Sequence, residues 1–374
     1  MNVSGRHRAH VSRLRHRQVL TTAAILSLSV VAAACSSSAS STSGTTAAQA
    51  KPTVVVFAGA GGLFQTVYEK YLLEPFTKKT GIKVQYVSDT IEADFAKVQA
   101  AKNNQTIDVL STNSATQIEG EAQGLFQPIT PAEVPNLANL LPISDLPRGD
   151  KEGVPLQYTA VGIEYNKTAF AKAGIPAPTS WNDLWNPKLK GHLALYDISI
   201  AYTQDLVSVI AGLQGGSVTN FAPGIKKLAQ LRSDGILASC PATPAEVDTL
   251  MQQGGIWVTV NGESRVADLK GMQIGFVEPK PVGGTFFENY LDIPKNAPHQ
   301  QAAEELVNYM ISAEAQPYLA KYLDFGTVNK SAVIPADVAA TVPDRTNLTI
   351  IPRGQQVPLL TDYVSQWKES IPNC

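Results

Sequence analysis

The chain has 374 residues, of which 44% are hydrophobic and 17% charged, and its formal net charge is -2. A chain of this length exceeds one typical hydrophobic core, so two domains or lobes are expected. The absence of a basic cluster excludes the usual electrostatic footprint of a nucleic-acid-binding protein.

Residues 1–34 have the composition of a secretory signal peptide. Five arginines and no acidic residue accompany an apolar run over 19–34 that is too short to span a bilayer. Ala32-Ala33-Ala34-Cys35 resembles the lipobox of bacterial lipoproteins, in which the cysteine is acylated and becomes the new N-terminus. The sequence therefore predicts export and lipidation of Cys35. A plain signal peptide cut nearby is the alternative, and both the Sec and the twin-arginine routes stay open.

A low-complexity linker is predicted over residues 35–51. Its main part, SSSASSTSGTTAAQA over 36–50, has no large apolar side chain and cannot bury a core. A flexible tether after a lipidated cysteine holds a soluble domain away from a membrane. Removal of residues 1–34 leaves 25 basic residues against 32 acidic ones, a net charge of -7. We therefore expect an acidic, extracytoplasmic protein anchored to the cell membrane through Cys35.

Strands and helices alternate in the first part of one lobe, which we place over residues 52–156. An apolar strand ends in a glycine loop, and further strands and helices follow. The predicted elements are a helix over 63–80, a strand over 82–88, a helix over 92–104 and a strand over 107–113. This alternation predicts a parallel sheet with right-handed crossovers.

A second α/β lobe is predicted over residues 157–284. The apolar run over 154–166 is long enough to cross into it, and Ser180 and Asp183 have the spacing of a capping box at a short helix. Further elements are strands at 192–197 and 256–262 and helices at about 203–213 and 221–233. Residues 285–328 are interpreted as a return strand followed by helices over 300–323, and residues 329–374 as a segment that packs back on the second lobe.

Two crossings between two α/β lobes predict a hinge of two strands, with the ligand in the cleft at the carboxyl ends of the strands. The candidate ligand-binding residues are those on the loops and strand ends that should face this cleft. They are Gly61, Gly62, Phe64, Thr112, Asn113, Tyr158, Asp197, Tyr202, Asn261, Glu263, Phe287 and Glu288.

Apart from Cys35, the chain contains only Cys240 and Cys374. An even number of cysteines in an exported chain allows one bridge, so we predict a disulfide that ties the C-terminal tail to the second lobe. Two free thiols are the alternative.

Several segments together resemble bacterial periplasmic binding proteins of the spermidine/putrescine type, from about residue 53 to 330. They are AGAGGLFQ at 58–65, LEPFTKKTGIKV at 73–84, SWNDLWNPKLKGHLALYD at 180–197 and the return segment that begins TFFENYLDIP at 285. The resemblance implies a type II periplasmic-binding-protein fold, a C-terminal tail on the second lobe, and a protein that closes on a ligand and delivers it to an ATP-driven permease.

The ligand class is less well fixed by the resemblance. Polyamine binders of this type carry a Trp and an Asp on the return strand, where this chain has Phe287 and Asn289. A diammonium ligand needs carboxylates and aromatic walls in place of its water shell. A polyamine-like, amino-acid-derived or aminophosphonate ligand is therefore predicted.

Ligand charge follows from the predicted cleft residues. Three acids, Asp197, Glu263 and Glu288, stand against a glycine-rich helix start that favours an anionic group. This combination favours a zwitterion or a mono-cation over a dication. A neutral polar ligand is the alternative if some of the acids are solvated surface groups.

The sequence offers few candidate catalytic residues. Only His192 and His299 remain after residue 34, and neither H-E-x-x-H nor G-x-S-x-G occurs. We expect a monomer without enzymatic activity, cofactor or metal, whose partners are a small-molecule ligand, an ABC permease and, through the lipid, the membrane. A ferric-iron-binding protein of the same fold and an exported lipoprotein enzyme stay as alternatives.

Overall fold

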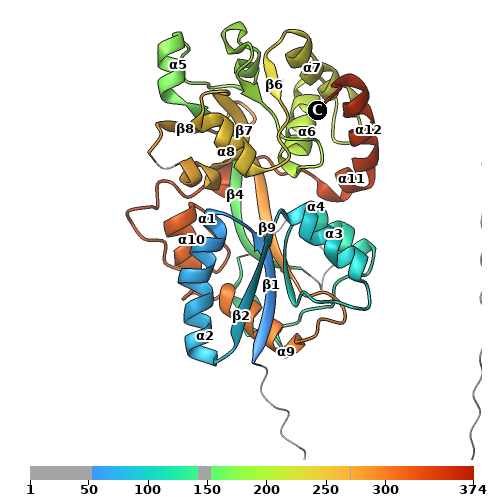
Figure 1. Cartoon of the computed structure of the whole chain (residues 1–374), viewed down its shortest axis with the longest axis vertical. Helices are drawn as coiled ribbons and strands as arrows, with labels where there is room; N and C mark the ends of the chain where they lie inside the picture. The colour runs from blue at the N-terminus through green and yellow to red at the C-terminus, as the bar shows by residue number, and fades with distance from the viewer. Residues whose placement is uncertain (1–52, 142–152, 270) are drawn as a thin grey trace, which may run out of the picture. The chain divides into compact units, whose positions relative to one another are not determined.

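Strands and helices alternate from residue 54 onward in a computed structural model that describes residues 53–141, 153–269 and 271–374 (Figure 1). The predicted signal peptide, linker and Cys35 lie outside the described residues. Within the described ranges, no helix combines the length and apolarity needed to cross a membrane.

The first-lobe elements follow the predicted order with one addition. The predicted helix over 63–80 is continuous but changes winding in its middle, and Gly81, at φ 80°, ends it as a left-handed cap. An unpredicted helix begins directly after the third strand, where Asn113 and Thr116 form a capping box. The elements are β1 (Val54–Ala60), α1 (Leu63–Val67), a π-helix (Tyr68–Leu73), α2 (Glu74–Thr80), β2 (Lys83–Asp89), α3 (Ile91–Ala101), β3 (Val109–Asn113), α4 (Ser114–Ala122) and a 3₁₀-helix (Pro135–Asn139).

The second-lobe elements lie between the two crossings. The predicted capping box is present, since Ser180 accepts from the backbone N–H of Asn182 and Asp183 accepts from that of Ser180, but the helix it starts is a 3₁₀-helix. The elements are β4 (Val154–Asn166), α5 (Lys167–Ala173), 3₁₀-helices (Trp181–Trp185, Pro187–Leu189), β5 (Leu193–Ala194), α6 (Ala201–Leu213), α7 (Ala222–Ser233), β6 (Leu237–Ser239), α8 (Pro244–Gln252), β7 (Val258–Gly262), a 3₁₀-helix (Glu263–Leu269) and β8 (Ile274–Val277).

The return segment contains two helices within the range 300–323, for which the sequence predicts helices. The break follows α9, where the Ser312 hydroxyl accepts from the backbone N–H of Ala315, and Pro317 then lies in the first turn of the next helix. The elements are β9 (Thr285–Asp292), α9 (Gln300–Met310), α10 (Gln316–Leu323), β10 (Gly326–Thr327), 3₁₀-helices (Arg345–Asn347, Val357–Leu359), α11 (Arg353–Gln356) and α12 (Leu360–Ser370).

One sheet runs through the described strands in the order β2-β1-β3-β9-β4-β7-β5-β6, with β8 and β10 also paired to β4. Its outer strands are parallel: β1 pairs with β2 and β3, and β5 pairs with β6 and β7. The two crossing strands, β4 and β9, run side by side and antiparallel. The first half of β4 pairs with β9 and its second half with β7 and β8, so this strand links the two lobes.

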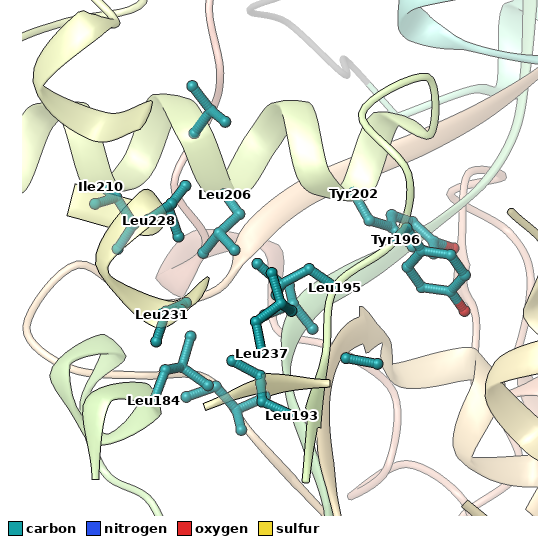
Figure 2. Packing of buried hydrophobic residues seen from close by; sticks show 14 of the residues in the cluster. Leu184, Leu193, Leu195, Tyr196, Tyr202, Leu206, Ile210, Leu228, Leu231 and Leu237 are labelled. Atoms are coloured by element: carbon teal, nitrogen blue, oxygen red, sulfur yellow. The ribbon is translucent and has the colours of Figure 1, made fainter. Parts of the chain in front are cut away.

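Two separate apolar cores lie on either side of these crossing strands. The first includes Phe57, Leu72 and Leu306 and defines the first lobe. The second defines the second lobe and includes the leucines that Figure 2 shows packed between α6, α7 and the short strands. Helix α12 adds Tyr363 and Trp367 to this second core. The exact lobe boundaries stay a prediction.

Cys240 and Cys374 form a disulfide, with their Cα atoms 5.1 Å apart. Cys240 follows β6 and Cys374 ends the chain, so the bridge fixes the C-terminal tail to the second lobe. The tail is held further by Arg232, whose Nη2 donates to the carbonyl oxygens of Pro372 and Asn373 at 3.2 and 3.3 Å.

Candidate functional site

A cavity of about 320 Å³ is lined by residues from both lobes. The first lobe contributes the β1–α1 loop, the start of α3 and the end of β3, and the second lobe contributes the starts of α6 and α8 and the 3₁₀-helix over 263–269. The crossing strands β4 and β9 also contribute side chains. This volume falls within the range of small-molecule sites.

Three amide side chains share one side of the cavity. Asn113, Asn289 and Gln157 lie on neighbouring strands, and the register pairs Asn289 with both of the others. Gln157 Nε2 donates to the Tyr68 hydroxyl at 2.7 Å and to Asn289 Oδ1 at 3.5 Å. Because paired residues of adjacent strands face the same side, this register builds a neutral polar surface.

Aromatic rings form other walls of the cavity. Tyr202, at the start of α6, meets Phe287 of β9 edge to face with the ring centroids 4.9 Å apart. Phe64 of α1 packs against Phe325 at 5.4 Å. Such rings can cover alkyl segments of a ligand or attract a cation to their faces.

Charged side chains complete the lining. Arg265 Nη1 lies 3.4 Å from Asp268 Oδ2, and Asp89 pairs with Lys97 at 2.9 Å. Within the part of the chain that the structure describes, Glu92 and Asp248 form no ion pair.

The carboxyl groups of Glu92 and Asp248 are partly withdrawn from water. Glu92 Oε1 accepts from Asn113 Nδ2 at 3.2 Å, and Asp248 Oδ1 is buried with no hydrogen-bond partner among the described residues. Burial raises the pKa of Glu92, and burial together with the charge of Asp268 raises the pKa of Asp248 to about 6, while the charge of Arg265 opposes both rises. These shifts indicate carboxylates that a bound cation would stabilise.

Six of the twelve predicted ligand-binding residues line the cavity: Gly61, Gly62, Phe64, Asn113, Tyr202 and Phe287. The fold itself requires glycine at two positions of this loop. Gly62 has a φ of 70°, and a Cβ on Gly61 would collide with the Ser88 hydroxyl.

Three predicted residues, Thr112, Tyr158 and Glu288, do not line the cavity although a sequence neighbour of each does. The Thr112 hydroxyl instead donates to Asp292 at 2.5 Å, and the Tyr158 ring packs on Phe286 at 5.0 Å. Successive strand residues point to opposite faces, so each prediction is displaced by one position along its strand.

The other three predicted residues, Asp197, Asn261 and Glu263, also lie outside the lining. Asp197 accepts from the backbone N–H and hydroxyl of Ser199 in its own loop, at 2.8 and 2.6 Å. Asn261 is fully buried and donates to Glu164 at 3.2 Å. Burial, followed by the charges of two nearby acids, raises the pKa of Glu263 to about 8.

Sequence reasoning missed several lining residues. Gln157 and Asn289 are the strand neighbours of predicted residues, and Glu92 lies in the first turn of a helix that follows a strand, so alternation and topology could have indicated them. Arg265 lies in the short 3₁₀-helix after β7 and has no such signal. The missed charged and polar residues are Tyr68, Ser88, Asp89, Thr90, Glu92, Ser111, Gln157, Thr243, Asp248, Arg265, Asp268 and Asn289.

A buried carboxyl group in the second lobe gives a pH-dependent prediction. Glu164 is fully buried, and burial, followed by the charge of Asp248, raises its pKa from 4.5 to about 8. The stabilisation that comes from its protonated form is fully present below pH 4.5 and is lost as the pH rises through about 8. The free energy of unfolding of Glu164→Gln, taken relative to that of wild type, should therefore increase by on the order of 2–4 kcal/mol from pH 5 to pH 9.

Urea unfolding at both pH values measures this difference. Glu369→Gln, which changes an exposed glutamate on α12, is the matched control and should follow the wild-type profile. Parallel pH profiles for wild type and Glu164→Gln would show that Glu164 does not titrate in this range.

No group of three or more His, Cys, Asp or Glu side chains within the described ranges could hold a metal ion.

Comparison with known proteins places these features in context. Residues 71–343 match the family model described as "Bacterial extracellular solute-binding protein". The spermidine/putrescine-binding periplasmic protein of Escherichia coli (strain K12) is 30% identical over 277 residues, which cover 70% of this chain and 74% of that protein. The gamma-aminobutyric acid-binding protein of Pseudomonas aeruginosa is 25% identical over 315 residues, covering 79% and 83%.

The fold also matches solved structures. The periplasmic binding protein AfuA from Actinobacillus pleuropneumoniae, with fructose-6-phosphate bound, gives a TM-score of 0.72 at 20% identity. The match covers 87% of this chain and all of that one. At this identity the likeness is one of fold.

Proposed function

Since this chain belongs to the family of bacterial extracellular solute-binding proteins, we propose that it captures a small organic ligand with an ammonium group and delivers it to an ABC importer. The observation that carries the proposal is a cavity lined by both lobes, in which Glu92 and Asp248 lie beside aromatic walls and form no ion pair among the described residues, while the charge of Arg265 acts on both from the same cavity. An ammonium group that leaves water needs such carboxylates and ring faces.

The linkage between lobes supports a protein that closes on its ligand. Lining residues come from α3 and β3 of one lobe and from α6 and α8 of the other, and β4 and β9 run between them. A ligand that contacts both sides stabilises the closed form by its differential affinity for that form. We propose that the closed monomer presents this ligand to a membrane permease.

The ligand classes that fit the proposal are amino-acid-derived compounds, aminophosphonates and polyamine-like compounds. The two relatives named above bind, by their names, polyamines and gamma-aminobutyric acid, which share a primary ammonium group. This chain has Phe287 and Asn289 on β9 at the cavity, where the resemblance predicts a Trp and an Asp for a polyamine binder. That exchange removes one carboxylate and favours a ligand with fewer positive charges.

A thermal-shift screen tests the proposed function. Polyamines, amino acids, aminophosphonates, sugars and ferric citrate are added separately to the purified chain. An ammonium compound at 100 times its Kd should stabilise the folded state by about 2.7 kcal/mol and raise the melting temperature. Stabilisation by sugars or ferric citrate, with no effect from any ammonium compound, would contradict the proposal.

We further propose that the mature protein is held at the cell membrane by a lipid on Cys35, because the AAAC junction is followed by a serine-rich linker. Mass spectrometry of the native protein should find Cys35 as the N-terminal residue with a diacylglyceryl group. Cys35→Ser should release the protein from the membrane fraction. An unmodified N-terminus at another residue would contradict the lipid anchor.

A further inference from the structure

Arg265 is a cavity residue whose hydrogen-bonding capacity is only partly used. Its side chain is 12% exposed, its Nη1 lies 3.4 Å from Asp268 Oδ2, and the side chain also hydrogen-bonds to the Tyr202 hydroxyl. Its Nε is buried and has no hydrogen-bond partner among the described residues. A guanidinium carries five N–H donors in a planar fork, so donors remain for a group inside the cavity.

The position of the guanidinium is fixed from both lobes. Arg265 belongs to the 3₁₀-helix of the second lobe, but its Cζ lies 3.8 Å from the ring centroid of Phe64, which belongs to the first lobe. This stacking holds the guanidinium plane in place and leaves its edge available for hydrogen bonds. The contact also makes Arg265 sensitive to the approach of the two lobes.

A second feature of the cavity, the N-terminus of α6, also favours an anionic group of the ligand. The 13-residue helix α6 has no side-chain cap at its N-terminus, and Ala201 and Tyr202 of its first turn line the cavity. The N-terminus of a helix carries a partial positive charge and favours anionic groups. Burial raises the pKa of the Tyr202 hydroxyl, and the charge of Arg265 and a hydrogen bond from its side chain oppose that rise.

We propose that Arg265 binds an anionic oxygen group of the ligand, while Glu92 and Asp248 bind its ammonium group. The substrate class is then a small zwitterion with separated charges, a carboxylate or phosphonate at one end and an amine at the other, and a diamine is disfavoured. This inference rests on the proposed function and deepens it. The sequence predicts that the anionic group lies at the glycine loop. This proposal places it at Arg265 instead, a side chain that the sequence did not indicate.

Calorimetric titration with four probes tests this assignment. The probes are 4-aminobutyrate, 3-aminopropylphosphonate, putrescine and butylamine, which share a primary amine and differ in the group at the other end. Wild type should bind one of the two zwitterions at least about tenfold more tightly than putrescine, and the preferred zwitterion shows whether the anionic group is a carboxylate or a phosphonate.

Variants separate binding from a structural role of Arg265. Arg265→Gln should weaken the preferred zwitterion by about 10- to 100-fold and should not weaken butylamine binding, because only the zwitterion loses a charge-assisted contact. Arg265→Lys, which keeps the charge without the planar fork, should retain part of the affinity and serves if the glutamine variant does not fold. Lys226→Gln, at an exposed site on α7, is the control and should bind like wild type.

Tighter binding of putrescine than of either zwitterion would overturn the assignment, as would an equal loss of zwitterion and butylamine binding in Arg265→Gln. In both cases the proposed capture of an ammonium compound would still stand. Failure of every ammonium compound in the thermal-shift screen is a different result and would contradict the proposed function itself.

Discussion

Arg353→Met is expected to destabilise the protein by about 3–5 kcal/mol, because it leaves a buried carboxylate without its cation. Arg353 is 1% exposed and Asp205 is fully buried. The guanidinium contacts both carboxylate oxygens of Asp205, with Nη2 2.8 Å from Oδ2. Burial already raises the pKa of Asp205 even with Arg353 in place, so the carboxylate has little access to water as a substitute partner.

The same network connects segments that are distant in sequence. Arg353 Nε donates to the hydroxyl of Ser114 at the start of α4 at 3.1 Å, and the Thr285 hydroxyl at the start of β9 donates to Asp205 at 2.9 Å. Arg353 therefore joins the C-terminal segment to α6, to a crossing strand and to a first-lobe helix. Loss of Arg353 therefore affects all four of these segments.

Urea unfolding measures this effect. The double variant Arg353→Met/Asp205→Asn should recover much of the lost stability, since no charge is then left buried. The penalty in the single variant should shrink as the pH falls, because burial raises the pKa of Asp205 and protonation removes its charge. Lys368→Met, at an exposed site on α12, is the control and should change stability by less than about 0.5 kcal/mol. A loss of stability below about 0.5 kcal/mol in Arg353→Met would contradict the stabilising role of the Arg353–Asp205 pair.

Removal of the disulfide is expected to lower the free energy of unfolding by a similar amount. Cys240 and Cys374 are 134 residues apart in sequence, and closing so long a loop restricts the unfolded chain by about 3–5 kcal/mol. The bridge also holds the tail that follows α12, where Trp367 Nε1 donates to the backbone carbonyl of Cys374 at 2.9 Å. The double variant Cys240→Ser/Cys374→Ser should therefore unfold at a lower urea concentration than oxidised wild type.

Reductant provides the internal control for this prediction. Dithiothreitol should lower the wild-type midpoint to that of the double serine variant and should leave the variant unchanged. Two free thiols in the oxidised wild type by mass spectrometry, with a midpoint that does not respond to reductant, would contradict the bridge.

The fold could be predicted from the sequence to the extent that it depends on periodic patterns. The apolar run at 154–166 coincides with β4, and the alternation of strands and helices from residue 52 predicts the order β1 to β3. The patterns could not predict that β5 has only two residues, or where the helical segment over 300–323 divides into α9 and α10. Those outcomes depend on tertiary packing and on local hydrogen bonds.

The candidate site was predicted at the level of strands and loops, and less well at the level of side chains. Thr112, Tyr158 and Glu288 each lie next to a lining residue on the correct strand. Which face of a strand points into a cleft depends on register, and a strand buried on both faces carries no polar alternation that would reveal it. Arg265 and Asp248 lie on elements outside the crossing strands, and only the three-dimensional arrangement brings them together.

The central claim is that the interlobe cavity binds an ammonium compound through Glu92 and Asp248. Calorimetric titration of the compound that stabilises wild type most in the thermal-shift screen tests it, with Glu92→Gln/Asp248→Asn as the variant. Glu369→Gln/Asp362→Asn, which neutralises two exposed acids on α12, is the matched control. We predict that the cavity variant loses about 100-fold or more in affinity and that the control changes by less than about twofold. Equal affinity of the cavity variant and wild type would contradict the account.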